Sequence, residues 1–412
     1  MVPSGGGDQQ SPPDGPPGQT PADLARSFFS DDADTETPAA AAAAGNPLGR
    51  LFAAVDSVSD SAMTYFYGHL FAIEPQARAM FPPAMDGQRK RFYQALARII
   101  ASGGDPERLT SYLDGLGRAH RKFGVQKEHF DSFRQALAAT FQRYAPAAWT
   151  DEAAAAWNEL FDRASSAMTE AAEQDAGHSP PWWLAEVVEH EVRGSDLAVL
   201  TLLPGQPLPY RAGQHISVQT PRWPRLWRNY SVANAPREDG SVTLHVRAVP
   251  GGLVSASLVH HVSTGDTLLL GAAAGAMTLD PDSDRDVLCL AGGTGLAPVR
   301  AIIEEIIGAP AAGRRREIVL YHGARREADL YDLYGLQQLE LNYPWLQVIP
   351  VVSEEAAPDA IFGAVPDVVG LSSWRNRDIY VAGPDAMMAR TVTELKDRGA
   401  PPERIHYDCP RC

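Results

Sequence analysis

VLCLAGGTGLAP, residues 287–298, is an apolar run that passes directly into a glycine-rich turn. The run predicts a buried strand, and the apolar spacing of residues 299–307 predicts that a helix follows the turn. Glycines let the backbone approach a pyrophosphate, and a helix N-terminus offers free N–H groups to its charge. The turn departs from the G-x-G-x-x-G pattern, so a tight strand–helix turn without a ligand is the alternative. The candidate nucleotide-binding residues are Gly293, Thr294, Gly295, Leu296, Ala297 and Pro298.

Strands and helices alternate after this turn. Apolar runs at 318–322, 346–352 and 379–382 predict further strands, with helical stretches between some of them. Such alternation predicts an α/β domain with a doubly wound parallel sheet over residues 285–412. Arg325 and Arg326 follow the second strand, where the adenosine ribose lies in such folds. They can pair with the 2′-phosphate of NADPH or form a solvated helix start, so the choice between NADH and NADPH stays open.

Residues 182–282 have a different pattern. Residues 241–247 alternate apolar and polar side chains, and Gly and Pro interrupt the segment at 204–205 and 250–252. This pattern predicts an antiparallel β-barrel. Within it, Arg228–Ser231 supplies an arginine that can neutralise a phosphate, a tyrosine that can stack on a flat ring and a small hydroxyl.

Four motifs in this part of the chain resemble those of the ferredoxin–NADP reductase superfamily. Arg228–Ser231 resembles the R-x-Y-S flavin motif, and Tyr210–Gln214 resembles the Y-x-x-G-Q strand. Gly251–Ser255 resembles the second pyrophosphate-binding turn, and Val381–Met388 resembles C-G-P-x-x-M. The resemblance, over residues 182–408, implies an FAD-binding domain followed by an NAD(P)-binding domain. The flavin-binding residues expected from it are His215, Arg228, Asn229, Tyr230, Ser231, Gly252 and Ser255.

The N-terminal part of the chain divides into two segments. Residues 1–46 are rich in Pro, Gly, Ala and Asp, and this composition predicts a disordered tail, because it offers too little apolar surface to offset the entropy of ordering. Residues 47–176 carry apolar side chains at helical spacing, such as Phe66, Leu70 and Phe71. We expect an all-α domain there.

Several stretches of the helical segment resemble a globin. Leu116–Val125 resembles the segment that carries the proximal histidine, which makes His120 the expected axial ligand of haem iron. Phe66–Phe71 resembles the F-Y-x-x-(M/L)-F stretch of the second globin helix, which includes Tyr67. Met80–Pro83 resembles the corner whose phenylalanine, here Phe81, packs on the porphyrin. Asp86–Arg89 resembles the start of the distal helix, where Gln88 faces the sixth iron position.

Two of these assignments have alternatives. His129 is a rival iron ligand, although it is more simply a solvated residue at the start of a helix. Tyr67 can also be an ordinary core tyrosine, although a buried phenol requires a hydrogen-bond partner.

Together the motifs resemble a flavohaemoglobin over residues 47–408. That resemblance implies haem b, FAD and NAD(P)H as cofactors. It also implies that electrons pass from NAD(P)H through FAD to haem-bound dioxygen, which converts nitric oxide to nitrate. Tyr67 and Gln88 are then the catalytic residues that hydrogen-bond the bound oxygen.

The chain departs from the family pattern at several positions. Phe130 replaces a tyrosine and Gln174 a glutamate, which in relatives make hydrogen bonds to the proximal histidine. A register shift to the adjacent Glu173 would restore the carboxylate. Phe92, which is expected to contact haem, replaces a distal leucine and is expected to crowd the pocket. At the C-terminus Asp408 keeps a carboxylate for the flavin, but the aromatic residue that covers the flavin is missing. These departures resemble the divergent flavohaemoglobins of actinobacteria.

Composition limits the remaining possibilities. The formal net charge of -15 disfavours nucleic acid as a partner. The sequence has neither an apolar run of about 20 residues for a membrane span nor the pattern of a signal peptide, so we expect a cytoplasmic protein. A monomer is the simplest expectation, and the sequence leaves the oligomeric state open. The pair Cys409 and Cys412 is too small to complete a zinc site and is interpreted as incidental.

Two alternatives to nitric oxide dioxygenation follow from the departures. The chain can be a haem–flavin oxidoreductase with a different donor or acceptor, because the flavin cover and the partners of the proximal histidine are changed. It can also be a haem sensor or an oxygen-binding globin coupled to a reductase, because sensing requires affinity and no turnover.

Overall fold

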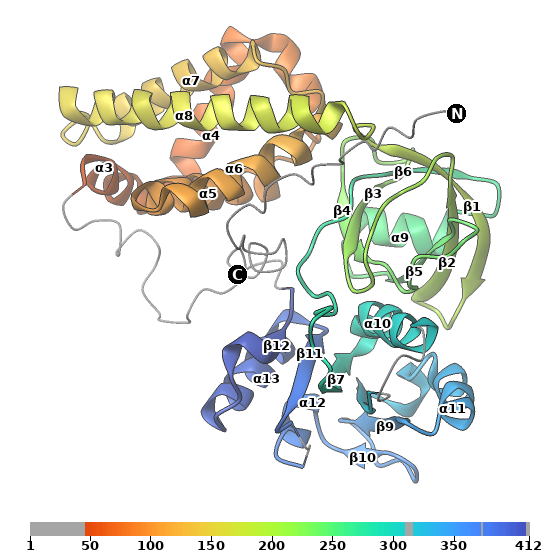
Figure 1. Cartoon of the computed structure of the whole chain (residues 1–412). Helices are drawn as coiled ribbons and strands as arrows, with labels where there is room; N and C mark the ends of the chain where they lie inside the picture. Colours follow the sequence, from red (N-terminus) through yellow and green to blue (C-terminus); the bar gives the residue numbers. More distant parts are fainter. Residues whose placement is uncertain (1–45, 310–315, 372–373, 409–412) are drawn as a thin grey trace, which may run out of the picture.

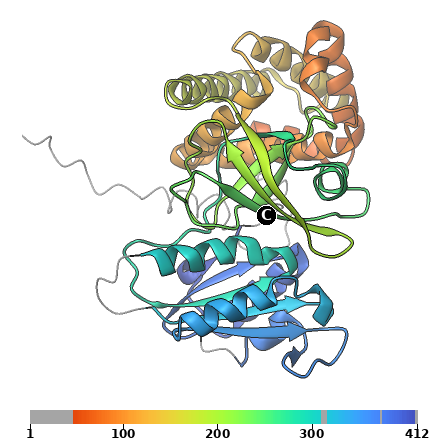
Figure 2. The same ribbon diagram turned by 90° about the vertical axis from the view of Figure 1, so that its right-hand side faces the viewer.

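The computed structural model describes residues 46–309, 316–371 and 374–408. Figure 2 shows the barrel between a helical domain above and a parallel-sheet domain below. The predicted tail, apart from Asn46, and the pair Cys409 and Cys412 lie outside the described residues. Among the helices within those ranges, none combines the length and the apolar character that crossing a bilayer requires.

The helical domain contains six α-helices and three short 3-10 helices within the described residues (Figure 1). In chain order these elements are α3 (Pro47–Asp56), α4 (Ser59–Ile73), η1 (Pro75–Met80), α5 (Asp86–Ala101), η2 (Ser102–Gly104), α6 (Pro106–His120), η3 (Arg121–Phe123), α7 (His129–Tyr144) and α8 (Asp151–Ala176). Their apolar faces meet in one core.

Local sequence explains where key helices begin and how closely they pack. The side chains of Asn46, Asp105 and Thr150 each accept a hydrogen bond from a backbone N–H in the first turn of α3, α6 and α8. On α6, a Cβ atom at Gly117 would lie 2.2 Å from the carbonyl oxygen of Met168 on α8. Glycine therefore allows α6 to lie directly against α8, which fixes the position of the C-terminal end of α6.

The barrel is a six-stranded antiparallel sheet in the order β4-β3-β6-β1-β2-β5. An isolated bridge between Val232 and Leu244 connects the two edges, so the sheet is nearly closed. Its elements are β1 (Trp183–Val192), β2 (Leu197–Pro204), β3 (His215–Gln219), β4 (Arg228–Ser231), β5 (Val242–Arg247), α9 (Leu253–His260) and β6 (Thr267–Leu270).

The C-terminal domain is a six-stranded parallel sheet in the order β10-β9-β8-β7-β11-β12. Its strands are β7 (Asp286–Gly292), β8 (Ile318–Ala324), β9 (Leu346–Val352), β10 (Ile361–Phe362), β11 (Arg377–Ala382) and β12 (Ile405–His406). Its helices are η4 (Gly293–Gly295), α10 (Leu296–Gly308), η5 (Glu327–Asp329), α11 (Leu333–Asn342), α12 (Val365–Val368), α13 (Asp385–Asp397) and η6 (Pro402–Arg404).

Helices cover both faces of this sheet. Alternate side chains of β7 enter two separate cores: Cys289 packs with α10 and α11, whereas Leu288 and Leu290 pack with α12 and α13. A strand that is buried on both faces carries apolar side chains at every position, which explains the continuous apolar run at residues 287–291.

The predicted fold class is confirmed: an all-α globin, an antiparallel barrel and a doubly wound parallel sheet. Sequence analysis did not predict α9, which follows the turn at residues 251–252, or the two-residue edge strands β10 and β12. Both edge strands are too short to produce a periodic pattern.

Candidate functional site

Tyr67 on α4 and Gln88 on the first turn of α5 form a polar pair inside the helical domain. The Gln88 amide donates a hydrogen bond to the Tyr67 hydroxyl, with 3.4 Å between Nε2 and Oη. Burial raises the pKa of the Tyr67 phenol, so it stays protonated at neutral pH and can donate a hydrogen bond. The ring centroids of Phe81 and Phe92 lie 5.3 and 5.8 Å from that of Tyr67. The polar pair therefore lies in aromatic surroundings.

Phe92 packs against α4. Its ring stacks on Phe66, with centroids 4.8 Å apart, and meets Phe133 edge-on at 6.1 Å. The substitution that we expect to narrow the distal pocket is thus accommodated by aromatic stacking.

His120 is the last residue of α6. Its Nδ1 atom lies 2.6 Å from the carbonyl oxygen of Leu116, one turn earlier. When Nδ1–H donates to that oxygen, Nε2 carries the lone pair that a metal ligand needs. Burial lowers the pKa of the imidazole, which favours this neutral form. The rival histidine, His129, accepts a hydrogen bond at Nδ1 from the backbone N–H of Gln126.

The surroundings of His120 fit a flat apolar cofactor such as haem. Helices α5 and α6 both pack on the short η2 corner and make few contacts with each other. Apolar side chains next to the core of this domain remain only partly buried, and a porphyrin between α5 and α6 would cover surface of this kind. They include Phe81, Phe92, Ile99, Leu116 and Phe133.

Neither departure that we noted near the proximal histidine supplies a polar partner. Phe130 meets Phe161 edge-on, with centroids 6.4 Å apart. Gln174 and the neighbouring Glu173 are both exposed on α8. A register shift that would restore a carboxylate through Glu173 therefore does not occur.

A carboxylate does reach the segment next to His120, from a position that sequence analysis missed. Asp175, in the last turn of α8, pairs with Arg121. The Arg121 guanidinium also donates to the carbonyl oxygen of Ser179, 2.8 Å away. This pair ties the proximal segment to the linker that enters the barrel.

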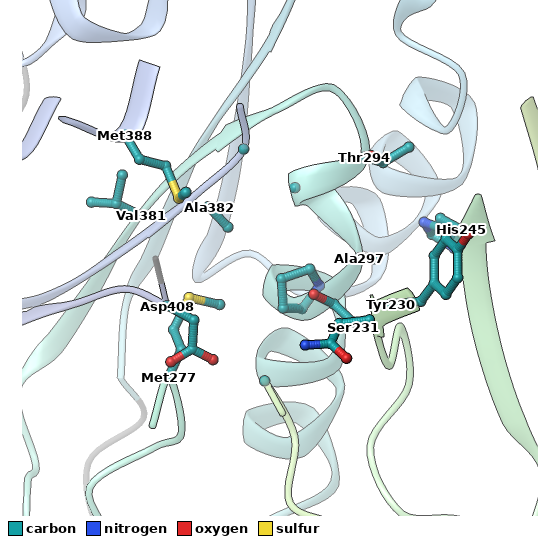
Figure 3. A pocket seen from close by; sticks show the side chains of 15 residues that line it. Tyr230, Ser231, His245, Met277, Thr294, Ala297, Val381, Ala382, Met388 and Asp408 are labelled. Carbon is teal, nitrogen blue, oxygen red and sulfur yellow. The ribbon is translucent and has the colours of Figure 1, made fainter. Parts of the chain in front are cut away.

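A second site lies between the barrel and the parallel-sheet domain. A pocket of about 640 Å³, partly open to solvent, separates β4 from the glycine-rich turn and the start of α10. Figure 3 shows Tyr230 and His245 on one side of this pocket and Asp408 and Met277 on the other. The predicted residues that line it are Asn229, Tyr230, Ser231, Thr294, Gly295, Ala297, Pro298 and Asp408.

The glycines of the turn have different roles. A Cβ atom at Gly295 would lie 2.3 Å from the carbonyl oxygen of Ala382, so this glycine serves the packing of the turn on β11. Gly293 has a φ of +53°, and a Cβ atom there would meet nothing within 4 Å. The backbone at Gly293 is therefore open to a ligand, which favours the nucleotide-binding interpretation over a turn that serves packing alone.

The remaining predicted residues lie outside the pocket lining. Leu296 is fully buried in the core, and Arg325 is exposed. Ser255 donates a hydrogen bond to the Gly252 carbonyl and accepts one from the Val249 N–H, so it holds the turn before α9. Arg228 is exposed on β4, and its positive charge lowers the pKa of Arg91 on α5, after the larger effect of burial.

Asp408 connects the C-terminal strand to the barrel. Its Oδ1 accepts a hydrogen bond from the backbone N–H of Ala276 at 2.9 Å, and its Oδ2 lies 3.6 Å from Nδ1 of His215. A Cβ atom at Gly275 would lie 2.2 Å from that Oδ2 atom. Glycine at 275 is therefore needed for Asp408 to reach the pocket.

Sequence analysis also missed a histidine–tyrosine cluster at this domain boundary. The Tyr331 hydroxyl, which precedes α11, lies 2.8 Å from Nδ1 of His245 on β5. The Tyr331 ring also meets His322 of β8 edge-on, with centroids 6.1 Å apart. Burial lowers the pKa of His245 to about 3 and that of His322 to about 4, so both imidazoles are neutral. His245 thus presents a neutral imidazole to the pocket.

Comparison with known proteins assigns each domain. Residues 64–168 match the globin family, residues 185–278 the oxidoreductase FAD-binding domain and residues 289–393 the oxidoreductase NAD-binding domain. These matches agree with the predicted cofactors haem, FAD and NAD(P)H.

Relatives fall into two groups. The reductase subunit of an aromatic O-demethylase from Amycolatopsis is 35% identical over 49% of the chain, and the chain spans 61% of its length. A flavohemoprotein from Rhizobium meliloti is 26% identical over 84% of the chain and 91% of its own length.

A flavohemoglobin from Malassezia yamatoensis has the same fold across all three domains. Its crystal structure matches with a TM-score of 0.72 at 19% identity, covering 90% of this chain and 98% of the other. The chain thus joins a globin domain to FAD-binding and NAD-binding oxidoreductase domains, and it is similar to a flavohemoprotein over 84% of its length.

Proposed function

We propose that this oxidoreductase transfers electrons from NAD(P)H through FAD to dioxygen bound at haem and converts nitric oxide to nitrate. The observation that carries the proposal is the Tyr67–Gln88 pair on the distal side, in a globin whose His120 has a free Nε2. Haem, when bound, supplies the iron that binds dioxygen, and each nitrate formed requires one electron. Flavin accepts the two electrons of a hydride and can release them singly.

The residues of the pocket between the barrel and the parallel sheet prepare the hydride step. Tyr230 offers a ring face to the flavin, and burial keeps its phenol protonated by raising its pKa. Ser231 offers a hydroxyl beside it. The turn at Thr294 and Gly295, at the start of α10, offers backbone N–H groups that can bind a pyrophosphate. Both groups line one pocket, so a flavin and a nicotinamide can meet there.

On the globin side, Tyr67 donates a hydrogen bond from a phenol that remains neutral. Gln88 orients that phenol and adds an amide donor at the same place. Two donors in apolar surroundings stabilise negative charge that develops on bound oxygen. His120, oriented by the Leu116 carbonyl, would bind the haem iron through Nε2.

A second candidate is an oxygen-binding or sensing globin that the reductase keeps reduced. The exposed position of Gln174 and the apolar contact of Phe130 favour it, because His120 then has no polar side-chain partner that would increase its electron donation. This candidate requires reduction of the haem and tight oxygen binding, with slow nitrate formation.

One experiment separates the two candidates. The purified protein is mixed without air with NADH or with NADPH while its visible spectrum is recorded, and nitrate is then measured after addition of oxygen and nitric oxide. Haem reduction within seconds and nitrate in proportion to the nicotinamide consumed support the dioxygenase. Rapid haem reduction without nitrate supports the sensor, and flavin reduction with haem left ferric contradicts both. Comparing the rate of haem reduction by NADH with that by NADPH also tests whether Arg325 and Arg326 favour NADPH.

A further inference from the structure

Lys122 is a half-buried cation at the junction of the globin and the barrel. It lies two residues after His120, in η3, and its Nζ donates a hydrogen bond to the Ser217 hydroxyl of β3 at 2.8 Å. Nζ also lies 5.1 Å from the ring centroid of Trp227 and 5.4 Å from that of Phe123.

The space around Lys122 depends on a glycine. A Cβ atom at Gly271 would lie 2.2 Å from the Ser217 Oγ and 3.5 Å from Lys122 Cδ. Any larger residue at 271 would displace the hydroxyl that receives the ammonium. The hydrogen bond across the domain junction therefore fits only because position 271 carries no side chain.

The charge of Lys122 has no acidic partner in the part of the chain that the structure describes. Within residues 46–309, 316–371 and 374–408, no carboxylate lies within ion-pair distance of Nζ. An ammonium has three N–H donors, and Ser217 accepts one of them. Ring faces stabilise a cation less than a carboxylate does, so this half-buried ammonium can still bind an anion.

A pocket lies beside the ammonium. It is partly open to solvent and has an empty volume of about 560 Å³, open solvent included. Its polar lining consists of Lys122, Arg225 and Gln219, and no acidic residue lines it. Aromatic rings of Phe123, Trp182 and Trp227 form much of the remaining wall. Two cations beside flat apolar surfaces suit a planar apolar molecule that ends in a carboxylate.

We propose that this pocket is a carboxylate-binding site in which Lys122 holds the carboxylate, and that the aromatic wall covers the ring system when the ligand is a free aromatic carboxylate. Two sources can supply that chemistry: a propionate of haem or a free aromatic carboxylate. Ser217 pairs in register with Asn229 of the flavin strand, and Lys122 follows the proximal histidine. A ligand in this pocket would therefore contact residues next to both candidate redox sites, the one at His120 and the one beside β4.

The variant Lys122→Met tests the site with little risk of unfolding. Methionine keeps a similar length, and replacing an unpaired half-buried charge by an apolar side chain is expected to preserve stability. Lys122→Arg retains the charge, and Lys127→Met removes an exposed lysine five positions later as a matched control. The melting temperature of each variant is measured first.

Binding of 1-naphthoate to the full chain loaded with FAD and haem is then measured by calorimetry. A free-carboxylate site predicts binding to the wild type and to the Lys127→Met variant, and an affinity at least about tenfold lower for the Lys122→Met variant. The Lys122→Arg variant should keep most of the affinity.

A haem propionate in the pocket predicts a different pair of results. The loaded protein then does not bind 1-naphthoate. After extraction of haem, the wild-type full chain should prefer haem b over its dimethyl ester by about tenfold or more, and the Lys122→Met variant should lose that preference. If neither naphthoate binding nor the preference for haem b depends on Lys122, the proposal is wrong. The propionate source rests on the proposed haem function, but neither measurement uses turnover, so failure of nitrate formation leaves both results interpretable.

Discussion

The hydroxyl of Tyr67 and the side-chain amide of Gln88 meet 3.4 Å apart across the interface of α4 and α5. Twenty-one residues separate them in the sequence. Aromatic rings surround the pair, and the phenol has its pKa raised by burial. Its hydrogen is therefore available to a ligand at any physiological pH.

Replacement of Tyr67 by Phe should weaken oxygen binding at haem. The change removes one donor and keeps the ring, so the expected loss is that of a single hydrogen bond to a partly charged acceptor, about 1.5–3 kcal/mol. Oxygen dissociation, followed by stopped-flow absorbance, should become roughly 10 to 100 times faster. The control is Tyr93→Phe, which removes a phenol that donates to Asp56 at 2.6 Å. Equal oxygen dissociation from wild type and the Tyr67→Phe variant would exclude Tyr67 as the donor.

Replacement of His120 by Ala should remove the axial ligand. The Soret band of the purified variant should shift or disappear, and added imidazole should restore it by occupying the vacated space. His129→Ala is the matched control, because that side chain accepts only a local backbone hydrogen bond. A normal Soret spectrum in the His120→Ala variant, or its loss in the His129→Ala variant, would reverse the assignment of the two histidines.

Gly295→Ala should destabilise the nucleotide-binding domain. The new Cβ atom would lie 2.3 Å from a backbone oxygen of β11, and backbone cannot move aside easily. Overpacking of this kind costs about 1–3 kcal/mol. Gly68→Ala on α4 is the control, since a Cβ atom there meets nothing within 4 Å and alanine favours the helix by about 1 kcal/mol. In urea unfolding, the free energy of unfolding should be lower than wild type for Gly295→Ala and higher for Gly68→Ala. An unchanged free energy of unfolding in Gly295→Ala would contradict the packing role of that residue.

Stability of the reductase half should fall as the pH falls below about 6.5, the unperturbed pKa of histidine. The folded-state pKa values of His245 and His322 are lowered to about 3 and about 4. At pH values between these and about 6.5, the unfolded chain therefore binds more protons than the folded chain. For each histidine, the free energy of unfolding then falls by about 1 kcal/mol for every pH unit, until the pH reaches the folded-state pKa of that histidine. Unfolding followed by flavin fluorescence at pH 7 to 4.5 measures this slope.

The matched variants for that slope are His245→Gln and His322→Gln, each of which should make the pH dependence shallower. His260→Gln, at an exposed histidine at the end of α9, should leave the slope unchanged. The attribution to buried histidines fails if all three variants keep the wild-type slope.

Local sequence predicted the elements that carry the candidate sites. The strand at residues 346–352 was predicted with the same limits that the structure shows, and the helix with Gln88 begins at Asp86 as expected. These predictions succeeded because hydrophobic periodicity and turn residues report on one element at a time. The four flavin and nucleotide motifs identified the reductase domains for the same reason, since each lies within one turn or strand.

Contacts between distant segments could not be predicted in this way. Lys122 and Ser217 are 95 residues apart, and His245 and Tyr331 are 86 residues apart. Each of these residues looks ordinary in its own segment. The two residues of each pair come into contact only because one domain packs against another. That packing depends on the shape of whole surfaces, which no single segment of sequence reports.

The sequence by itself therefore determined the three domains and their order, and it singled out His120 as the expected iron ligand, because each depends on patterns within single elements. The tertiary structure alone decided that Asp175 pairs with Arg121, that Gln174 is exposed, and that half-buried Lys122 has no acidic partner among the described residues. Burial and charge pairing are properties of the space around a side chain, and several segments of the chain together create that space.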